Sequence, residues 1–353
     1  MTPAEPPARA PLADAPASGD TFPAPRLADA LNAALRPLAG HAARLAAAVS
    51  GGADSAMLAA HAAPLARRLG IELLIFHVHH GLQAVADDWA AHVQGLGGIL
   101  GVPVHTAWAR VRADSGLGVE AAAREARYAA LAELAAQHGV THILLAHHQR
   151  DQAETVLLRL LRGTGLQGMA AMAPSMPRDG LTYLRPWLDQ DRAEILGAAR
   201  AFAARHGWQP VQDPTNADPR YTRAAVRELL APVLDARWPG WQARLADHAR
   251  HMADAAGIVE DVARADLASL QPSADSASFA LAPWRELPAA RQAQVVRYWL
   301  RLHGARMPTE ARLADMLRQL RQLHSLGHDR QMRVAHARHL IRCHRGRVWI
   351  ENR

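Results

Sequence analysis

The sequence predicts an α/β fold: a doubly wound parallel sheet, followed by a helical linker and a small α+β domain at the C-terminus. From residue 26 to about residue 140, apolar stretches with strand character alternate with helical ones. This alternation is typical of a parallel sheet with helices on both faces. After Pro186 the pattern becomes helical, and short strands return only near the end of the 353-residue chain, which is long enough for two or three domains.

The first predicted domain consists of strand–helix pairs. Strands are expected at 44–49, 71–79, 102–108 and 141–147, and helices at 56–69, 87–100, 119–138 and 151–162. Because such sheets bind ligands at the carboxyl ends of their strands, residues that follow the strands are expected to share a site. Polar residues follow three of these strands, at Ser50, 77–81 and 147–151.

The second half contains a helix at 192–206, a polar loop at 212–221 and a mostly helical region at 222–270, broken near Pro232 and Pro239. Beyond a polar stretch at 271–278, helices are expected at 288–302 and 308–323, with strands at 331–335, 338–343 and 348–351. We therefore divide the chain into a disordered Ala/Pro-rich tail (1–25), an α/β domain (26–230), a helical linker (231–270) and a small C-terminal domain (271–353).

Composition limits the class of protein. A hydrophobic content of 50% with a mean hydropathy of −0.13 indicates a soluble globular chain, and no apolar run is long enough to span a bilayer. The N-terminal segment lacks the apolar core of a signal peptide. A single cysteine, Cys343, excludes an intrachain disulfide and a CxxC metal site. We therefore expect a cytoplasmic protein with no membrane partner.

The chain is strongly basic without containing lysine. Its net charge is +7 and its pI about 10.7, and every basic residue besides histidine is arginine. This excludes a lysine Schiff base and the lysine of a Walker A loop. An arginine-rich surface suits phosphate backbones, so charge indicates nucleic-acid binding without establishing it.

The most informative segment lies between the first strand and the first helix. A tight Gly-Gly turn at a helix N-terminus collects backbone N–H groups and the positive end of the helix dipole around one point, which favours an anion. Asp54 would repel that anion unless a cation such as Mg²⁺ lay between them. The segment consists of Ser50, Gly51, Gly52, Ala53, Asp54 and Ser55.

This string resembles the SGGxDS loop of the PP-loop ATP pyrophosphatases, an adenine nucleotide alpha hydrolase-like fold whose members cleave ATP to AMP and PPi. Three further segments resemble the same family: GVEAAAREARY at 118–128, HHQRDQAET at 147–155 and RAAVR at 223–227. The family patterns are GxEaxARxxRY, HHxxDDxxET and RNxxR. This chain departs from them at Arg150, where the first Asp is usual, and at Ala224, where Asn is usual.

The segment HVHHGL at 77–82 resembles the lysidine-synthetase branch of that family. Its histidines point in different directions along a strand end and no cysteine completes a ligand set, so contacts to the nucleotide are favoured over a metal site. Residues 287–352 resemble the small substrate-binding domain of bacterial tRNA(Ile)-lysidine synthetases. The family reaction converts the wobble cytidine (position 34) of tRNA(Ile) with a CAU anticodon to lysidine, using ATP, Mg²⁺ and free L-lysine.

The resemblance implies a role for each matching residue. The loop 50–55, with His79 and His147, would bind ATP, and Asp54 and Asp151 would hold Mg²⁺. Asp151 and Glu154 share one helical turn and would bind either Mg²⁺ or the lysine ammonium, one of them also accepting a proton. The remaining catalytic and phosphate- or tRNA-binding candidates are arginines: Arg124, Arg127, Arg223 and Arg227.

Two other functions stay open at this stage. One is another PP-loop enzyme, inserting sulfur into tRNA or amidating a nucleotide, although one distal cysteine and no glutaminase segment argue against these. The other is a catalytically degraded, basic tRNA-binding protein, supported by Arg150 and Ala224. The sequence leaves the oligomeric state open between a monomer and a homodimer.

Overall fold

The computed structural model describes residues 20–40, 44–79, 86–109, 119–211, 218–323 and 332–352. The chain divides into two compact units, Met1–Arg250 and His251–Arg353, and the long helix α10 (Trp241–Ser269) runs through the division. No helix within the described ranges has the length and apolar character needed to cross a membrane.

The first unit is built on a six-stranded sheet, which confirms the predicted α/β architecture. Its strand order is β3-β2-β1-β4-β6-β5, and every neighbouring pair is parallel except β5 with β6. Because β1 lies between β2 and β4, the segments that follow β1 and β4 emerge side by side. The strands are β1 (Arg44–Ala48), β2 (Glu72–His79), β3 (Val104–Trp108), β4 (His142–Leu144), β5 (Ser175–Arg178) and β6 (Leu181–Leu184).

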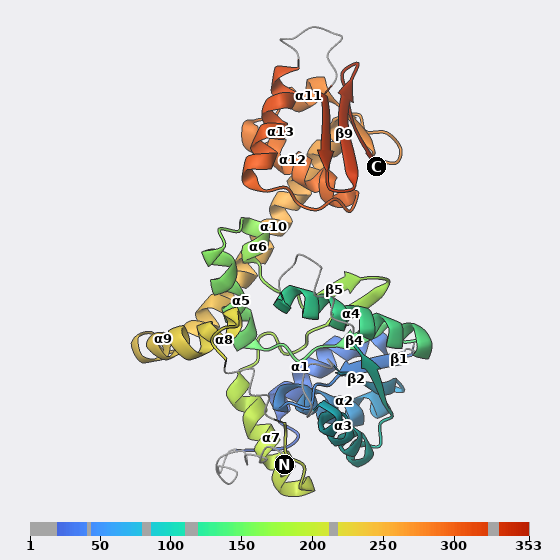
Figure 1. The fold of residues 1–353 in the computed structure, drawn as a ribbon, viewed down its shortest axis with the longest axis vertical. Helices are drawn as coiled ribbons and strands as arrows, with labels where there is room; N and C mark the ends of the chain where they lie inside the picture. The colour runs from blue at the N-terminus through green and yellow to red at the C-terminus, as the bar shows by residue number, and fades with distance from the viewer. Residues whose placement is uncertain are drawn as a thin grey trace, which may run out of the picture. The chain divides into compact units, whose positions relative to one another are not determined.

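Helices cover both faces of this sheet, as expected of a doubly wound fold (Figure 1). Leu45 and Ala47 of β1 face one core with the apolar sides of α1, α2, α3 and α7, whereas Ala46 faces a second core with α4. This alternation follows from the two-residue period of a strand. The helices are α1 (Pro25–Leu35), α2 (Ala53–Leu69), α3 (Ala86–Leu100), α4 (Val119–His138), α5 (Gln149–Leu161), α6 (Leu166–Met169) and α7 (Arg192–His206), with a 3₁₀ turn η1 (Arg36–Leu38).

The hairpin β5–β6 is absent from the sequence-based prediction. Its two-residue turn consists of Asp179 and Gly180, both with positive φ, which is the backbone of a type I′ turn. Asp-Gly is among the strongest short-range hairpin signals, so the signal was present in the sequence. The hairpin lengthens the sheet beyond β4 and carries the chain back toward α7.

The region expected to be mostly helical contains four consecutive helical segments. The predicted breaks are found where proline or glycine interrupts the ladder: Pro232 lies in the first turn of α9, and the chain turns at Pro239 and Gly240 before α10. The segments before α10 are α8 (Thr222–Ala225), the π-helical turn η3 (Val226–Leu230) and α9 (Ala231–Arg237).

The second unit packs helices on one face of an antiparallel sheet with strand order β7-β10-β9-β8. Its core contains Trp284, Trp299, Met316 and the inward-facing residues of the strands. The predicted helices and strands of this region are present, together with β7 and α11, which were not expected. The elements are β7 (Ser278–Ala280), α11 (Leu281–Glu286), α12 (Ala289–Leu302), α13 (Glu310–Gln322), β8 (Met332–His336), β9 (His339–His344) and β10 (Arg347–Asn352).

Candidate active site

The turn between β1 and α2 is a compact loop that leaves the start of a helix open. Gly51 has φ of +96°, a conformation that L side chains rarely adopt, and its carbonyl oxygen accepts a hydrogen bond of 2.9 Å from the backbone N–H of Val211. The Ser55 hydroxyl lies 3.1 Å from the Ser50 backbone nitrogen and 3.2 Å from the Gly52 carbonyl oxygen. The loop is therefore held by its own side chains and by a neighbouring strand-like segment.

The helix begins earlier than the sequence pattern predicts. α2 starts at Ala53 rather than at Ala56, so Asp54 and Ser55 lie in its first turn. The first N–H groups of a helix have no partner inside the helix, and the helix dipole makes this end positive. An anion placed at this turn would meet those donors together with the carboxylate of Asp54.

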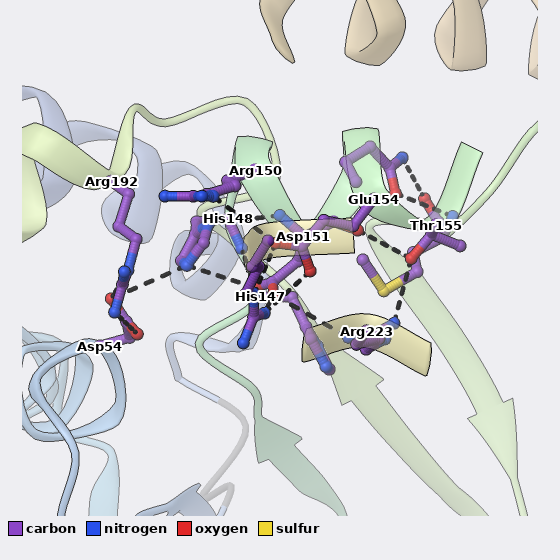
Figure 2. Close-up of polar contacts among 12 residues, drawn as sticks. Asp54, His147, His148, Arg150, Asp151, Glu154, Thr155, Arg192 and Arg223 are labelled. Carbon is purple, nitrogen blue, oxygen red and sulfur yellow. Dashed lines mark hydrogen bonds and ion pairs between the residues drawn. The ribbon is translucent and has the colours of Figure 1, made fainter. Parts of the chain in front are cut away.

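Asp54 contacts two residues that local sequence patterns did not connect with it. Arg192, at the start of α7, lies with Nε 3.3 Å from Oδ1 and Nη2 3.4 Å from Oδ2 of Asp54. His148 is the second, with Nε2 3.8 Å from the same Oδ1, a contact drawn in Figure 2. Arg192 is 138 residues away in the chain, so only the tertiary fold identifies it as part of the site.

His148 also joins Asp54 to Asp151. His148 is the N-cap of α5: its Nδ1 accepts from the Asp151 backbone nitrogen at 3.4 Å, and Asp151 Oδ2 accepts from the His148 backbone nitrogen at 3.1 Å. This is a reciprocal capping box. Burial alone would raise the pKa of Asp151, but His148 and the nearby arginines outweigh it and hold that pKa below its ordinary value. Asp151 is therefore a carboxylate near neutral pH.

Glu154 lies one turn further along α5 and is almost completely covered, with 1% of its side chain exposed. Both of its carboxylate oxygens accept hydrogen bonds from Arg227, at 2.6 Å from Nε and 2.8 Å from Nη2. Arg150, the residue that departs from the family pattern, also contacts it, with Nε 3.6 Å from Oε1. Arg150 therefore turns toward the acid cluster rather than away from the site.

Arg223 and Arg227 both reach the acid-bearing helix from α8 and η3. Arg223 donates through Nη2 to the Thr155 hydroxyl at 3.1 Å, as Figure 2 shows, and its Nη1 lies 3.9 Å from Asp151 Oδ1. Ala224, where the family pattern has Asn, follows Arg223 in the sequence, and its side chain is buried. In the structure the two arginines are thus paired with protein acceptors.

Next to these arginines lies a cavity of about 670 Å³ whose lining is strongly basic. Arg124 and Arg127 of α4 line it, together with Arg159 of α5 and Arg162, the residue that follows the end of α5. Burial, together with the charge of Arg124, lowers the pKa of Arg127. The cavity is lined by the arginines at 124, 127, 159, 162, 223 and 227, by Thr155, Leu158, Met172 and Tyr221, and by three alanines.

His147 is half-buried beside the acid cluster and is neutral. Burial lowers its pKa to about 3, against the attraction of Asp151. Its Nδ1 lies 3.3 Å from Nε of Arg185, which can only donate, so Nδ1 accepts and the ring proton is on Nε2. His147 therefore presents a hydrogen-bond donor and no positive charge.

The histidines after β2 do not form a metal centre within the described residues. Nδ1 of His77 lies 2.8 Å from the Val49 carbonyl oxygen, and burial lowers its pKa. His79 is buried, with its ring 6.0 Å from that of Trp108. His80 to Leu82 lie outside the described residues, as do Gly118 and the loop 212–217, and the side chain of Glu120 is not described either.

The structure thus brings Asp54, Asp151 and Glu154 into one region, with Arg223 and Arg227 beside the last two. Across the described part of the chain, no group of three or more His, Cys, Asp or Glu side chains could hold a metal ion by itself. Arg192 and Arg185 are residues of this region that the sequence did not assign to the site, whereas His148 belongs to the segment 147–151 that was expected there. An Arg directly after a predicted helix N-cap, as in Asp191-Arg192, is too common to have indicated such a role.

Known protein families match both parts of the chain. A PP-loop domain model matches residues 23–234, and a TilS substrate binding domain model matches residues 279–349. A tRNA(Ile)-lysidine synthase from Bordetella bronchiseptica is 66% identical over 340 residues, which cover 96% of this chain and 98% of that protein. A tRNA(Ile)-lysidine synthase from Ralstonia nicotianae is 43% identical over 309 residues, covering 87% of this chain and 64% of its own.

A solved structure shares the fold. The U34-tRNA thiolase NcsA from Methanococcus maripaludis, determined with its 4Fe-4S cluster, matches 65% of this chain and 79% of its own with a TM-score of 0.54. At 13% sequence identity this likeness concerns the fold alone.

Proposed function

Because the chain belongs to the tRNA(Ile)-lysidine synthase family, a family of C–N ligases with a PP-loop ATP-binding domain, we propose that it joins free L-lysine to the wobble cytidine of tRNA(Ile) at the site formed by residues 50–55 and 147–155. The observation that carries the assignment is 66% identity across nearly the whole of both chains. The geometry adds a glycine turn at the start of α2, in the same region as an acid–arginine cluster.

The chemistry of the reaction defines what the site must supply. Cytosine O2 is a poor leaving group, so it first attacks the α-phosphorus of ATP and PPi leaves. The ε-amine of lysine then attacks C2 of the adenylated cytidine, and AMP leaves. The first step needs negative charge neutralised on the phosphates, and the second needs a lysine amine that has lost its proton.

The turn 50–55 is proposed to hold the triphosphate. Its support is the start of α2, which has no side-chain cap, so that its N–H groups and the helix dipole favour an anion. Arg192 adds a full positive charge beside this helix start, through its contact with Asp54. Because the chain contains no lysine, Arg192 is proposed to supply the positive charge that a phosphate-binding lysine supplies in other nucleotide sites.

The donor set at this edge fits a magnesium ion that is held partly by the substrate. Mg²⁺ prefers carboxylate oxygens and is usually bound by one or two of them together with substrate phosphates. Asp54 and Asp151 offer two such carboxylates on either side of His148. When bound there, the ion would neutralise charge on the α-phosphate and PPi. Two protein carboxylates also agree with the lack of a three-acid cluster among the described residues.

We assign different roles to the two acids of α5. Glu154 has both oxygens bonded to Arg227, so it is proposed to orient that guanidinium. Asp151 is more open, at 12% exposure, and is bonded less tightly to Arg227, at 3.2 Å. Asp151 is therefore the acid proposed to meet the ion and the lysine ammonium, and to receive a proton from the latter.

The arginine-lined cavity is proposed to bind the phosphates of the tRNA anticodon loop. Its support is the convergence of six guanidinium groups around about 670 Å³. Guanidinium groups bind phosphate through two parallel hydrogen bonds. A cytosine acted on by a base-modifying enzyme must be unpaired, which an anticodon loop provides. His147, neutral and donating from Nε2, is proposed to bind nucleotide oxygen at the same edge.

The two alternative functions fit these observations less well. Sulfur insertion commonly needs a reactive thiolate, whereas Cys343 is buried in β9 and burial raises its pKa to about 11. A degraded, binding-only protein would have no reason to keep the Asp54, Asp151 and Glu154 constellation ordered by arginine and histidine contacts. The setting proposed for the enzyme is the cytoplasm, where tRNA, ATP and lysine are present together.

The deciding experiment is incorporation of labelled lysine into unmodified tRNA(Ile) transcripts, with AMP and PPi measured in the same reaction. We expect lysine incorporation to depend on ATP and to release one AMP and one PPi for each lysine incorporated. A tRNA transcript with a methionine identity and the same CAU anticodon is the control. Binding of tRNA without AMP release would contradict the proposal and favour the binding-only alternative.

A further inference from the structure

The sheet of the second unit has two chemically different faces. One face is apolar and packs in the core against α12 and α13, which lie on one side of this sheet in Figure 1. Side chains alternate between the two faces of a strand, so the residues between these apolar ones point to the opposite face. That opposite face is here called the arginine–tryptophan face after Arg333 of β8, Arg342 of β9, and Arg347, Trp349 and Glu351 of β10. It also carries Ala335, Leu340 and His344.

The register of the strands places three of these residues in one row. Arg342 is paired with Arg333 on one side and with Trp349 on the other. Residues paired across antiparallel strands have Cβ atoms about 4.5–5.5 Å apart, and like charges in such a pair destabilise a sheet. The stability of the unit therefore does not explain why two arginines occupy opposed positions. An anionic ligand on this face would explain it.

Trp349 is the exposed aromatic group of the row, with 37% of its surface accessible. The guanidinium carbon of Arg347 lies 5.8 Å from its ring centroid, within cation–π distance. Arg347 is itself fixed, since Nη2 donates at 2.9 Å both to the Gln271 carbonyl oxygen and to the Ser278 hydroxyl. A flat aromatic surface is thus presented beside an anchored positive charge.

The charges of the face favour a polyanion. Arg342 is paired with Glu351, but Arg333 is exposed and makes no ion pair with any residue that the structure describes. Three arginines stand against one acid. An exposed aromatic ring between basic side chains is the combination that binds single-stranded nucleic acid, the base stacking on the ring and the phosphates lying against the arginines.

We propose that the arginine–tryptophan face binds an unpaired nucleotide of the tRNA substrate, with the base stacked on Trp349 and the flanking phosphates held by Arg333 and Arg347. This inference rests on the proposed function, because it takes tRNA as the substrate. It assigns RNA contact to a particular surface of the C-terminal unit, apart from the arginine-lined cavity of the first unit.

The test measures binding of a tRNA(Ile) transcript to the full-length chain over a series of salt concentrations. Trp349→Ala is expected to weaken binding about tenfold, a typical effect of losing one stacked base, whereas Trp349→Phe should retain most of the affinity. Arg333→Gln should reduce the slope of log affinity against log salt by about one phosphate contact. The matched control is Arg318→Gln, which removes the same charge from α13 and should change neither quantity.

A single-stranded oligouridylate is the second probe. It should compete with the tRNA for the wild-type chain, and a double-stranded RNA of the same length should compete less well. The proposal that a base stacks on Trp349 would be overturned if the duplex competed as well as the oligouridylate. It would also be overturned if Trp349→Ala and Trp349→Phe bound tRNA with equal affinity. If thermal unfolding shows that Trp349→Ala does not fold, the test is the slope of log affinity against log salt for Arg333→Gln, because Arg333 is exposed. An unchanged slope in that variant would then overturn the proposal.

The two proposals fail in different ways. If Trp349→Ala and Arg333→Gln both bind tRNA with the affinity and salt slope of the wild type, the arginine–tryptophan face does not bind RNA. Intact lysine incorporation in the same variants would leave the enzymatic assignment unaffected. Absence of lysine incorporation in the wild type would remove the enzymatic assignment, while binding measurements would still report on the face.

Discussion

Arg227 and Glu154 form a two-pronged ion pair in which both carboxylate oxygens accept from one guanidinium, at 2.6 and 2.8 Å, across 73 residues of chain. With Glu154 almost fully covered, the pair ties η3 to the helix that carries Asp151. Such a buried pair is costly to break, because removing one partner leaves the other charged and without compensation.

The first prediction concerns the stability of this pair. Arg227→Ala is expected to lower the free energy of unfolding by about 3–5 kcal/mol, since it strands the buried Glu154 carboxylate. The double variant Arg227→Met with Glu154→Leu should recover much of that loss. Urea unfolding followed by circular dichroism measures both. Arg223→Ala, whose nearest acid is 3.9 Å away, is the control and should cost under about 1 kcal/mol. Equal losses in both arginine variants would contradict a special role for the pair.

The second prediction concerns Asp54. Asp54→Ala is expected to reduce lysine incorporation about 100-fold or more, because the phosphates lose the carboxylate proposed to hold their counter-ion. The thermal midpoint should stay close to that of the wild type, since Asp54 is partly exposed and its contacts with Arg192 are longer than 3.2 Å. Asp29→Ala, an exposed acid on α1, is the matched control. Normal incorporation by the Asp54 variant would end the proposed metal role.

The third prediction concerns Arg192. Arg192→Gln is expected to raise the KM for ATP about tenfold, with a smaller change in kcat. The reason is that the variant loses one charge-assisted contact to a phosphate, and this contact is made in both the ground state and the transition state. Steady-state kinetics with ATP as the varied substrate measures this. Arg205→Gln removes the same charge from the far end of α7 and should leave the KM unchanged. A fall in kcat alone would assign Arg192 to the transition state instead.

The fourth prediction concerns acid stability. His61 is buried and neutral, with Nε2 accepting from the Ala24 backbone nitrogen at 3.0 Å and Nδ1 lying 2.8 Å from the Met57 carbonyl oxygen. Burial lowers its pKa to about 4, against 6.5 for the exposed ring. The unfolded chain therefore binds this proton at higher pH, so the contribution of His61 to stability is complete above pH 6.5 and falls as the pH drops toward 4. The expected loss over that window is about 3 kcal/mol.

Urea unfolding between pH 4 and 7 checks this prediction by comparing the wild type with His61→Gln. The variant has no titrating group at this position. The slope of its free energy of unfolding against pH should therefore be smaller than that of the wild type, by the equivalent of up to one bound proton across the same window. Parallel pH profiles for the two proteins would show that His61 does not supply the linkage.

Much of the fold and part of the site follow from short stretches of sequence. The strand, the glycine turn and the helix at 44–69 are recognisable because strand period, glycine φ and helix termination are properties of adjacent residues. The helices α4 and α7 begin and end where the pattern predicts. The Asp-Gly turn of β5–β6 was equally local, and its omission was an error of interpretation rather than a limit of the sequence.

The sequence by itself therefore indicated the PP-loop segment, the acids of α5, the arginines at 223 and 227, and most of the strands and helices. Each of these features depends on a few neighbouring residues. The tertiary structure alone decided that Arg192 contacts Asp54, that Arg227 occupies both oxygens of Glu154, and that Arg333, Arg342 and Trp349 share one row. These contacts join residues brought together by sheet order and helix packing, and no local period records which distant side chain will arrive at the same point.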